Sequence, residues 1–446
     1  MGKYEKNMKL KDLKKHTIVC IGLGAEIAGL IDYLYAKKLN KKIVVLDNKN
    51  KTDLLSRYPK FKKYKNIVFQ KDTRSFNELK KFSLIFKSPG AHIDLALRKK
   101  LSHEGSLIIS PMQLFLELSP SKNIIGVTGT KGKGTTSALI AEILKKAKKK
   151  VWLGGNIGIA PFDFIKKIKK SDWLVLELSS FQLEDMNAQL PISVLTNFSP
   201  EHLKPADPNN PNHHPSLKHY WQAKLQIVKT KNKNHLFIVN EKLKDDIKKE
   251  NLQAKIIYFK TSNLATRLPG EHNKENIAAA VTVAKSLKIK DKIIAKAVKN
   301  FKGLEHRLEK VTIKKGVEYY NDSFSTIPES TITAIKAFNK PIILLAGGAD
   351  KGSDFSGLAK IVKQKVKALI LFKGLATPRL KREIIKSGFN PKNIFEVDNM
   401  KKAVTQSQRQ AKSGDIVLMS PAAASFGIFK NYKDRGKQFK QSVLLL

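Results

Sequence analysis

Short apolar runs rich in Val and Ile recur along this chain, and turn residues and then a helical pattern follow each of them. The runs lie at residues 17–21, 43–46, 84–86, 124–127, 173–177, 192–195, 236–239, 342–345, 369–372 and 416–419. Continuous apolar strands that alternate with helices are typical of parallel sheets covered on both faces. The sequence therefore predicts an α/β fold built on parallel sheets.

The length of 446 residues exceeds what one hydrophobic core usually supports, since single cores stop growing beyond about 250 to 300 residues. We expect three domains. Boundaries are expected near Pro111, before the strand at 124–127, and near Gly303, after the helix that begins at Asn276 and its successor. The expected domains are residues 1–112, 113–302 and 303–446.

The charge is strongly positive, because the sequence has 84 Lys and Arg but only 38 Asp and Glu, which gives a formal net charge of +46. Such a field attracts nucleotides, phosphorylated substrates and, without selectivity, nucleic acid. The lysines are spread in short pairs, whereas a nucleic-acid reader more often concentrates them in one patch. We expect solvated lysines and no specific nucleic acid, with a basic nucleic-acid-associated ATPase kept as an alternative.

The cell compartment is indicated by what the sequence lacks. Cys20 is the single cysteine and lies in an apolar run, so neither a disulfide framework nor a zinc site made of cysteines can form. The sequence has no apolar run of 18 residues, and its start lacks the apolar segment of a signal peptide. We expect a soluble cytoplasmic protein without membrane insertion.

The stretch GVTGTKGKGTT at 126–136 resembles a phosphate-binding loop, because it follows an apolar strand and opens a helix with an apolar face. Glycines let backbone N–H groups close on phosphate oxygens, and Lys133 can reach the terminal phosphates. Two residues depart from the pattern: Val127 replaces a glycine, and Gly134 replaces the Ser or Thr that ligates Mg²⁺. We interpret the loop as a working nucleotide site that has lost one metal ligand. Its expected ATP-binding residues are Gly129, Thr130, Lys131, Gly132, Lys133, Gly134 and Thr135.

Two further patterns indicate a function only weakly when each is taken alone. Glu177 ends the apolar run at 173–177, where a carboxylate can hold Mg²⁺ directly or through water, although it could equally cap a helix or be solvated. The stretch at 22–27 invites an interpretation as an NAD site with Asp47 as the ribose acid. That motif is weak, because Ile27 stands where the third glycine belongs.

Taken together, the motifs closely resemble the Mur ligases over about residues 17 to 440. They are GVTGTKGKGTT at 126–136, GGNIG at 154–158, LELSSFQLE at 176–184, SPEHL at 199–203, QAKLQI at 222–227, GEHNKENIAAA at 270–280, GLEHRLE at 303–309, YNDSFSTIPE at 320–329, GGADKGSDF at 347–355 and SPAAASFGIFKNYKDRG at 420–436. LELSSFQLE and the last block are most similar to the branch that adds glutamate to UDP-N-acetylmuramoyl-L-alanine.

This resemblance implies an ATP-dependent, ADP-forming amide ligase of cytoplasmic peptidoglycan precursor synthesis, working through an acyl phosphate. It implies a Rossmann-like N-terminal domain for the uridine nucleotide, a central phosphate-loop ATPase domain and a C-terminal Rossmann-like domain for the amino acid. The implied partners are UDP-N-acetylmuramoyl-L-alanine and glutamate, and the expected state is a monomer. The sequence leaves open whether D- or L-glutamate is preferred.

The resemblance also implies roles for individual residues. The catalytic set is Lys133, Glu177, His202 and Lys224, with Glu177, His202 and Lys224 at the metal and Lys224 carrying a CO₂-derived carbamate. Only the QAK context separates Lys224 from a surface lysine. Asn273, His306, Arg307 and Asp322 resemble further ATP contacts. Gly22, Gly24, Asp47, Asn156, Ser179 and Gln182 resemble the UDP-substrate set, and Thr326, Lys351, Ser425 and Tyr432 the glutamate pocket, where cations and hydroxyls suit a doubly acidic substrate.

Three departures from the family pattern leave alternatives open. Gly134 lacks the hydroxyl, Lys204 stands where an Asp is common and the loop from there to Pro215 resembles an insertion, and Phe324 occupies a position that is lysine in some relatives. The alternatives are another Mur or folylpolyglutamate-type ligase with a different acceptor, and a binding protein that has lost catalysis.

Overall fold

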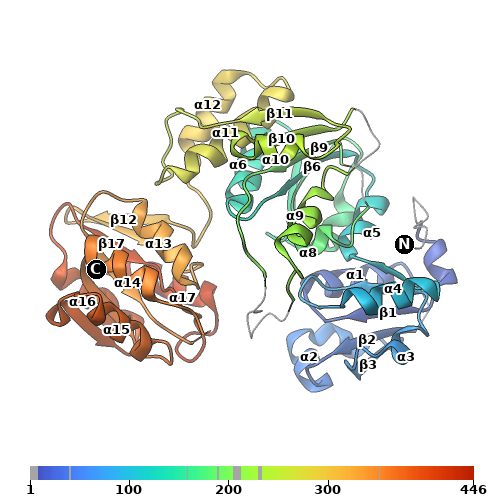
Figure 1. Ribbon diagram of the computed structural model, residues 1–446, viewed down its shortest axis with the longest axis horizontal. Coiled ribbons are helices and arrows are strands. Elements are labelled where there is room, and N and C mark those ends of the chain that lie inside the picture. The colour runs from blue at the N-terminus through green and yellow to red at the C-terminus, as the bar shows by residue number, and fades with distance from the viewer. Residues whose placement is uncertain are drawn as a thin grey trace. The chain divides into compact units, whose positions relative to one another are not determined.

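The computed structural model describes residues 9–39, 42–157, 159–187, 190–203, 212–229, 234–350 and 352–446. The chain forms two compact units. One comprises Met1–Ser262 and Glu275–Ala297, and the other comprises Asn263–Lys274 and Val298–Leu446. In Figure 1 the colour follows the chain, so the strands of the N-terminal sheet are blue and those of the C-terminal sheet are orange to red. The α/β class expected from the sequence is confirmed in both units.

The first sheet belongs to the N-terminal part of the first unit. Its strands are β1 (Ile18–Ile21), β2 (Ile43–Asp47), β3 (Ile67–Lys71), β4 (Leu84–Lys87) and β5 (Leu107–Ile109), in the parallel order β3-β2-β1-β4-β5. The helices are α1 (Ala25–Ala36), α2 (Lys51–Arg57), α3 (Phe76–Leu79), α4 (Leu95–His103) and α5 (Pro111–Leu118). This strand order is Rossmann-like, and it reverses at β1, where open sheets bind ligands.

The second sheet of the same unit holds the strands β6 (Asn123–Thr128), β7 (Val151–Gly155), β8 (Trp173–Glu177), β9 (Ile192–Leu195), β10 (Leu236–Asn240) and β11 (Lys255–Phe259). Their parallel order is β11-β10-β9-β6-β8-β7. The helices are α6 (Lys133–Lys146), α7 (Pro161–Phe164), α8 (Ser180–Leu183), α9 (Leu217–Leu225), α10 (Lys244–Lys248), α11 (His272–Ser286) and α12 (Asp291–Asn300). Because β6 lies between β9 and β8, the segments after all three strands emerge at one edge.

The sheet of the second unit has the strands β12 (Glu309–Lys314), β13 (Val317–Asn321), β14 (Ile342–Ala346), β15 (Val366–Phe372), β16 (Ile394–Val397) and β17 (Ile416–Met419). Their order is β12-β13-β17-β14-β15-β16, and only β12 is antiparallel to its neighbour. The helices are α13 (Pro328–Lys336), α14 (Ser356–Lys365), α15 (Thr377–Lys386), α16 (Met400–Gln410) and α17 (Tyr432–Leu444). Short 3₁₀ helices complete the chain at η1 (Asp12–Lys15), η2 (Pro59–Lys63), η3 (Ile165–Lys167), η4 (Glu241–Leu243) and η5 (Pro391–Asn393).

The central strands are buried on both faces, as their continuous apolar sequences predict. Every residue of β1, β9, β14 and β17 is buried, and separate clusters of apolar side chains cover the two faces of the sheet in the second unit. Burial on both faces leaves the strand ends as the places where polar side chains can gather. Within the described ranges, no helix combines the length and apolar character needed to cross a bilayer.

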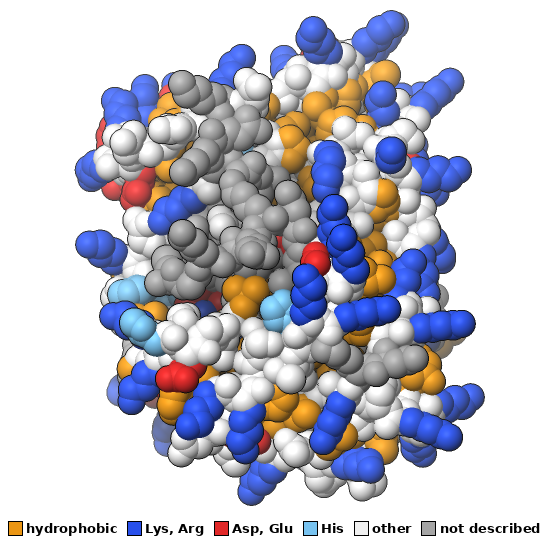
Figure 2. Space-filling view, turned by 90° about the vertical axis from the view of Figure 1, so that its right-hand side faces the viewer, with side chains coloured by type: hydrophobic (Ala, Val, Ile, Leu, Met, Phe, Trp, Pro, Cys, Tyr) orange, Lys and Arg blue, Asp and Glu red, His pale blue; other side chains and the backbone are white. Residues whose placement is uncertain are grey.

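The surface carries the excess lysine. Figure 2 shows one face of the molecule, on which Lys and Arg side chains project from many places and do not gather into one patch. On this face, the distribution is the one that the spread of lysine pairs along the sequence predicts.

Candidate active site

The phosphate loop connects β6 to α6 in a backbone form that needs its glycines. Gly129 and Gly132 have φ values of 143° and 80°, in the region that favours glycine. A Cβ on Gly129 would lie 2.0 Å from Thr196 Oγ1, and one on Gly132 would lie 2.1 Å from Asn276 Oδ1. The structure therefore packs the loop against neighbouring segments too closely for any side chain at either glycine.

Hydrogen bonds from backbone and side-chain groups hold the loop to the segment after β9. Thr130 N donates to Asn197 O at 3.0 Å, and Lys131 N donates to Asn197 Oδ1 at 2.8 Å. Thr196 Oγ1 donates to Lys131 O at 2.6 Å. The loop is thus supported from the adjacent strand, as a preformed anion site requires.

Lys133 is the first residue of α6 and folds back over the loop. Its Nζ donates to Gly129 O and to Thr130 O, both at 2.9 Å. Gly134 follows inside the helix and is buried, while Thr135 is half-buried. The expected strand, loop and helix are all present, and Lys133 lies at the N-terminus of the helix.

Lys224 lies on α9 and is almost completely buried, with 1 % of its surface exposed. Its Nζ donates to Gly129 O at 2.8 Å and lies 4.5 Å from the centre of the Tyr220 ring. Burial, reinforced by the charge of Lys133, places the pKa of Lys224 well below its ordinary value. This lysine belongs to the site and is not a solvated surface lysine.

Tyr220 lies one helical turn before Lys224 and was not among the residues expected from the sequence. It is fully buried, and its hydroxyl lies 3.2 Å from Thr130 Oγ1. Burial raises the pKa of Tyr220, so the phenol stays protonated. Its four-residue spacing from Lys224 on a helix is a signal by which it could have been found.

Glu177 ends β8 with 2 % of its surface exposed. Its Oε1 accepts from Asn156 Nδ2 at 2.9 Å, whereas its Oε2 is buried without a hydrogen-bond partner. A buried carboxylate oxygen without a partner is costly unless something positive binds it. The donor set therefore fits a divalent cation, and Asn156, expected to contact the substrate, orients Glu177 in this structure.

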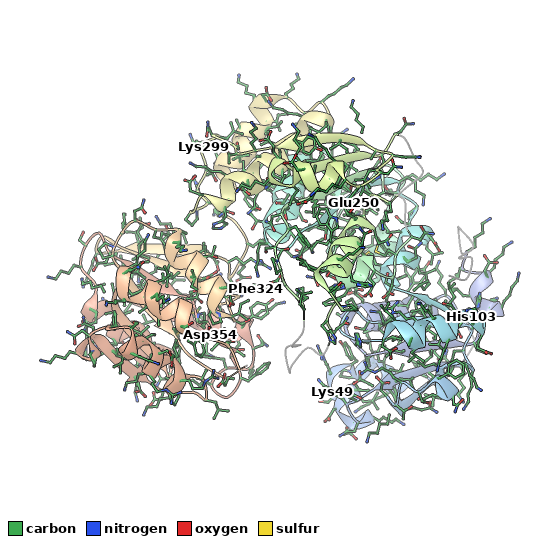
Figure 3. The ribbon with its side chains drawn as sticks, in the orientation of Figure 1. Lys49, His103, Glu250, Lys299, Phe324 and Asp354 are labelled. Atoms are coloured by element: carbon green, nitrogen blue, oxygen red, sulfur yellow. The ribbon has the colours of Figure 1, made fainter. Side chains whose placement is uncertain are left out.

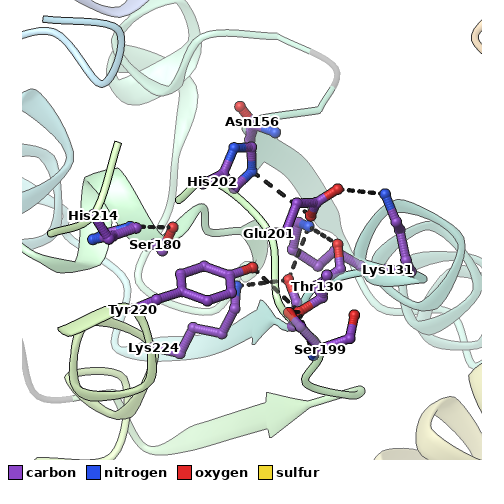
Figure 4. A network of polar contacts seen from close by, with 12 residues as sticks. Thr130, Lys131, Asn156, Ser180, Ser199, Glu201, His202, His214, Tyr220 and Lys224 are labelled. Carbon is purple, nitrogen blue, oxygen red and sulfur yellow. Dashed lines mark hydrogen bonds and ion pairs between the residues drawn. The ribbon is translucent and has the colours of Figure 1, made fainter. Parts of the chain in front are cut away.

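Glu201 and His202 follow β9 and face the phosphate loop (Figure 4). Glu201 forms an ion pair with Lys131, and its second oxygen lies 3.7 Å from His202 Nε2. Burial raises the pKa of Glu201, but Lys131 and His202 outweigh it and the net shift is downward. Burial lowers the pKa of His202, so its imidazole tends to be neutral and able to ligate a metal.

The segment after His202, expected as an exposed insertion from Lys204 to Pro215, lies partly outside the described residues, which resume at 212. At its described end the expected exposure is wrong, because Asn212 and His214 are buried against their neighbours. Its ends meet, since His214 N donates to His202 O at 2.8 Å. The His214 ring stacks on Phe181 with centroids 4.6 Å apart, and its Nε2 lies 2.9 Å from Ser180 Oγ. Burial lowers the pKa of His214 to about 3.

The expected UDP-substrate residues fall into two groups. Gly22, Gly24 and Asp47 meet at the ends of β1 and β2, where Asp47 Oδ2 accepts from Leu23 N at 2.7 Å. Asp47 thus supports the glycine loop itself, and Gly22 has a φ of 77°.

The second group lies at α8. Ser179 and Gln182 form a capping box at the start of this helix, and Gln182 is fully buried. Gln182 Nε2 also donates to Glu26, on the first turn of α1, and burial raises the pKa of Glu26 to about 7. In this structure Gln182 joins the two sheets of the first unit instead of facing solvent.

Further candidates gather at the strand ends of the second unit. Asp322 follows β13, accepts from Leu308 N at 3.1 Å and Ser420 Oγ at 2.7 Å, and has its pKa raised to about 6 by burial. The guanidinium of Arg307 lies 3.8 Å from the centre of the Phe324 ring. Phe324, labelled in Figure 3, is 40 % exposed. Phe324 in turn packs edge-on against Tyr432, with centroids 5.2 Å apart.

The amino-acid pocket expected in this unit is described in part. Ser425 is buried, Thr326 and Tyr432 are half-buried, and the Tyr432 ring lies 6.0 Å from that of His306. Lys351 lies outside the described residues. Asn273, at the start of α11, is buried and donates to Pro269 O at 2.7 Å.

Arg435 was also not expected from the sequence. It is fully buried and donates to Ser323 Oγ, Ser323 O and Ala423 O at 3.0, 2.9 and 3.2 Å. Burial lowers the pKa of Arg435 to about 9. This arginine ties the segment after β13, which holds Asp322 and Thr326, to the segment after β17, which holds Ser425.

Comparison with known proteins agrees with this geometry. Residues 127–263 match the Mur ligase middle domain, and residues 306–423 match the Mur ligase glutamate ligase domain. The UDP-N-acetylmuramoylalanine--D-glutamate ligase of Acetivibrio thermocellus is 33% identical over 98% of this chain and 99% of its own length. The chain belongs to the Mur ligase family. The enzyme of the same description from Clostridioides difficile is 34% identical over 97% of this chain and 99% of its own.

Solved Mur ligases share the fold. UDP-N-acetylmuramate-alanine ligase MurC from Thermotoga maritima has a TM-score of 0.57 at 15% identity, covering 96% of this chain and 99% of its own. The MurF ligase from Thermotoga maritima, in complex with ADP, has a TM-score of 0.57 at 17% identity, covering 91% and 96%. As a Mur ligase the chain is an ATP-dependent ligase. Glu177, with its unpartnered oxygen, and His202 are the residues that would hold the metal, which supplies charge neutralisation at the phosphates.

Proposed function

We propose that this chain joins D-glutamate to the L-alanyl carboxylate of UDP-N-acetylmuramoyl-L-alanine, with ATP converted to ADP and phosphate, in peptidoglycan precursor synthesis. Curated relatives of that description, 32 to 34% identical over 97 to 98% of this chain, support the proposal. The observation that carries it is one hydrogen-bonded network in which Lys133 and Lys224 share the carbonyl of Gly129.

The chemistry follows in two steps. A carboxylate oxygen of the L-alanyl group attacks the γ-phosphorus of ATP, and ADP leaves. The glutamate amine then attacks the acyl carbon, loses a proton and expels phosphate from a tetrahedral intermediate. Both steps bring anions together, so positioning and charge neutralisation by Lys133 and the helix N-terminus of α6 should dominate the rate enhancement.

Lys224 carries a carbamate in this proposal. A neutral amine attacks the carbon of CO₂ and loses a proton, which turns a cation into an anion able to ligate metal. Two features support the carbamate. Burial lowers the pKa of Lys224, which favours the neutral amine. Lys224 Nζ and Lys133 Nζ donate to the same oxygen, Gly129 O, so the Lys133 ammonium is close enough to stabilise the negative charge of the carbamate. Protein equilibrated with ¹³C-bicarbonate should show one carbamate carbon resonance that is absent in Lys224→Ala.

The second unit would bind glutamate and complete the ATP site. Ser425, Thr326 and Tyr432 are proposed to receive the glutamate carboxylates, with Arg307 and Asp322 at the nucleotide. We also propose that the domains span 1–112, 113–302 and 303–446, and that the protein is a monomer working in the cytoplasm, where UDP-linked precursors and ATP are found. Light scattering during size-exclusion chromatography tests the monomer.

One assay tests the proposed function. Phosphate release is measured with UDP-N-acetylmuramoyl-L-alanine and either glutamate enantiomer, and the product is identified by mass spectrometry. Release that needs the UDP-sugar and D-glutamate together supports the proposal. A product formed only with L-glutamate would refute the preference for D-glutamate. Release driven by DNA or RNA alone would refute the proposal in favour of a nucleic-acid-associated ATPase.

A further inference from the structure

Glu201 lies among the cations of the nucleotide site. It pairs with Lys131 of the phosphate loop and lies beside His202, and its side chain is 23% exposed. Figure 4 shows it between these two residues. No role was expected for Glu201 from the sequence, and the phosphate chemistry above does not use it.

The phosphate loop of this chain has a gap in its metal ligands. Position 134, where a phosphate loop normally provides a hydroxyl to Mg²⁺, is glycine. Thr135 does not replace it without a change in the loop, because consecutive helix residues point about 100° apart. Thr130 Oγ1 is already engaged, with Ser199 N, Ser199 O and the Tyr220 hydroxyl.

We propose that Glu201 anchors the Mg²⁺ that accompanies the nucleotide, directly or through one water, in place of the hydroxyl missing at Gly134. The inference rests on the proposed use of ATP at this site. Mg²⁺ prefers oxygen ligands and keeps several waters, so a carboxylate near the loop can serve where a helix hydroxyl cannot. Glu177 Oε2, at the end of β8, is a buried carboxylate oxygen without a hydrogen-bond partner, and Glu201 follows β9, on the other side of the strand β6 that leads into the phosphate loop.

The ion pair between Glu201 and Lys131 can open when nucleotide binds, and this would free the Glu201 carboxylate for the metal. The Lys131 side chain is 52% exposed, so it can turn to a phosphate oxygen without unpacking the core. That turn gives Lys131 a new anionic partner and leaves the Glu201 carboxylate for the cation between the phosphates and the protein. Before nucleotide binds, the same carboxylate forms the ion pair with Lys131 and neutralises its charge.

Calorimetry on the full-length protein tests this without turnover. ADP is titrated into wild type, Glu201→Gln, Gly134→Ser and the double variant, each with Mg²⁺ and with EDTA. In wild type, Mg²⁺ should tighten ADP binding by about tenfold, a usual size for coupling between two ligands. Glu201→Gln should reduce this to less than about threefold, and adding Gly134→Ser should restore most of it.

Controls separate the proposal from simpler explanations. Glu142→Gln removes one carboxylate, in an exposed pair with Lys146 on α6, and should keep the wild-type Mg²⁺ effect. Urea unfolding verifies that each variant is folded. The proposal is overturned if Glu201→Gln keeps the wild-type effect of Mg²⁺ on ADP affinity, or if this variant binds ADP more tightly by the same factor with and without Mg²⁺. It is also overturned if adding Gly134→Ser to Glu201→Gln does not restore the Mg²⁺ effect. Wild-type turnover with D-glutamate alongside any of these results leaves the proposed function intact.

Discussion

Lys133 and Lys224 donate to the same carbonyl oxygen, that of Gly129, at 2.9 and 2.8 Å. Two ammonium groups on one acceptor repel each other, and the more buried of them loses its proton more easily. Lys224 is the buried one, and its pKa is lowered accordingly. The fold thus prepares one lysine to bind phosphate as a cation and the other to react as a neutral amine.

Removal of Lys224 should abolish most activity. We expect Lys224→Ala to lose at least about a hundredfold in kcat, the scale of losing one electrostatic group in an active site. Added formate or acetate should restore a little, because either anion can stand in for the carbamate carboxylate. Phosphate release with both substrates is the measurement, and Lys218→Ala, an exposed lysine on the same helix, is the control. Full activity in Lys224→Ala contradicts the assignment.

His214 should make stability depend on pH. Its folded pKa of about 3 lies below the ordinary value near 6.5, so between these values the unfolded chain binds a proton that the folded chain refuses. Stability should therefore fall as the pH falls from about 6.5 towards 3, by up to about 1.4 kcal/mol per pH unit from this residue. Urea unfolding across this range should show a shallower slope in His214→Gln.

Ser180→Ala is the control for His214, because it removes the hydroxyl near the His214 ring but keeps the imidazole. It should retain the wild-type slope. A slope equally shallow in both variants would mean that the hydrogen bond, and not titration of the buried ring, sets the pH dependence.

Position 134 should set how much Mg²⁺ the enzyme needs. Gly134→Ser supplies the hydroxyl of an ordinary phosphate loop, so the Mg²⁺ concentration giving half-maximal rate should fall. Thr135→Ala should keep most of the turnover, since that side chain points about 100° away along the helix. No shift in Gly134→Ser, together with loss of turnover in Thr135→Ala, would indicate a loop that slips by one residue when it binds nucleotide.

The Phe324 ring should keep the Arg307 guanidinium in position to bind the nucleotide. A guanidinium on an exposed aromatic ring is stabilised by about 0.5 to 1 kcal/mol, so Phe324→Leu should raise the KM for ATP by about twofold to fivefold and leave the KM for glutamate unchanged. Phe324→Tyr keeps the ring and should resemble wild type. An increase confined to the KM for glutamate would place the ring in the amino-acid pocket instead.

Nucleic acid should bind weakly despite the charge. Because the lysines are spread over the surface, binding to random duplex DNA should rely on counterion release and fall steeply with salt. Fluorescence anisotropy at several salt concentrations measures this. Sub-micromolar binding at physiological salt with one preferred sequence would contradict the expectation.

The sequence predicted the central strands well, because burial on both faces leaves a continuous apolar run. Strands at or near sheet edges were missed for the same reason: β12 mixes Glu309, Lys310 and Thr312 with apolar residues, and its partner β13 forms the antiparallel hairpin that the parallel pattern does not anticipate. β7, which ends in two glycines, was also missed.

At the site, residues within recognisable motifs could be predicted, but the contacts between segments could not. The motifs indicated Lys133, Glu177 and Lys224, whereas the carbonyl shared by two lysines depends on how α9 packs against the loop. Glu201 and Arg435 lie within the motifs, but no role was expected for them. The ion pair of Glu201 with Lys131 and the burial of Arg435 against Ser323 are visible only in three dimensions.

The path of the chain between the two units limits how this protein can be divided. Asn263–Lys274 belongs to the second unit although it precedes Glu275–Ala297 of the first. A Cβ on Gly270 would lie 3.0 Å from Ala337 Cβ, and one on Gly303 would lie 3.0 Å from Leu268 Cδ2, so this short segment is packed into the second unit. An expression fragment that starts at Val298 therefore omits part of the second unit. A fusion in which a linker replaces Glu275–Ala297 and joins Asn263–Lys274 to Val298–Leu446 is the better starting point for producing the second unit alone.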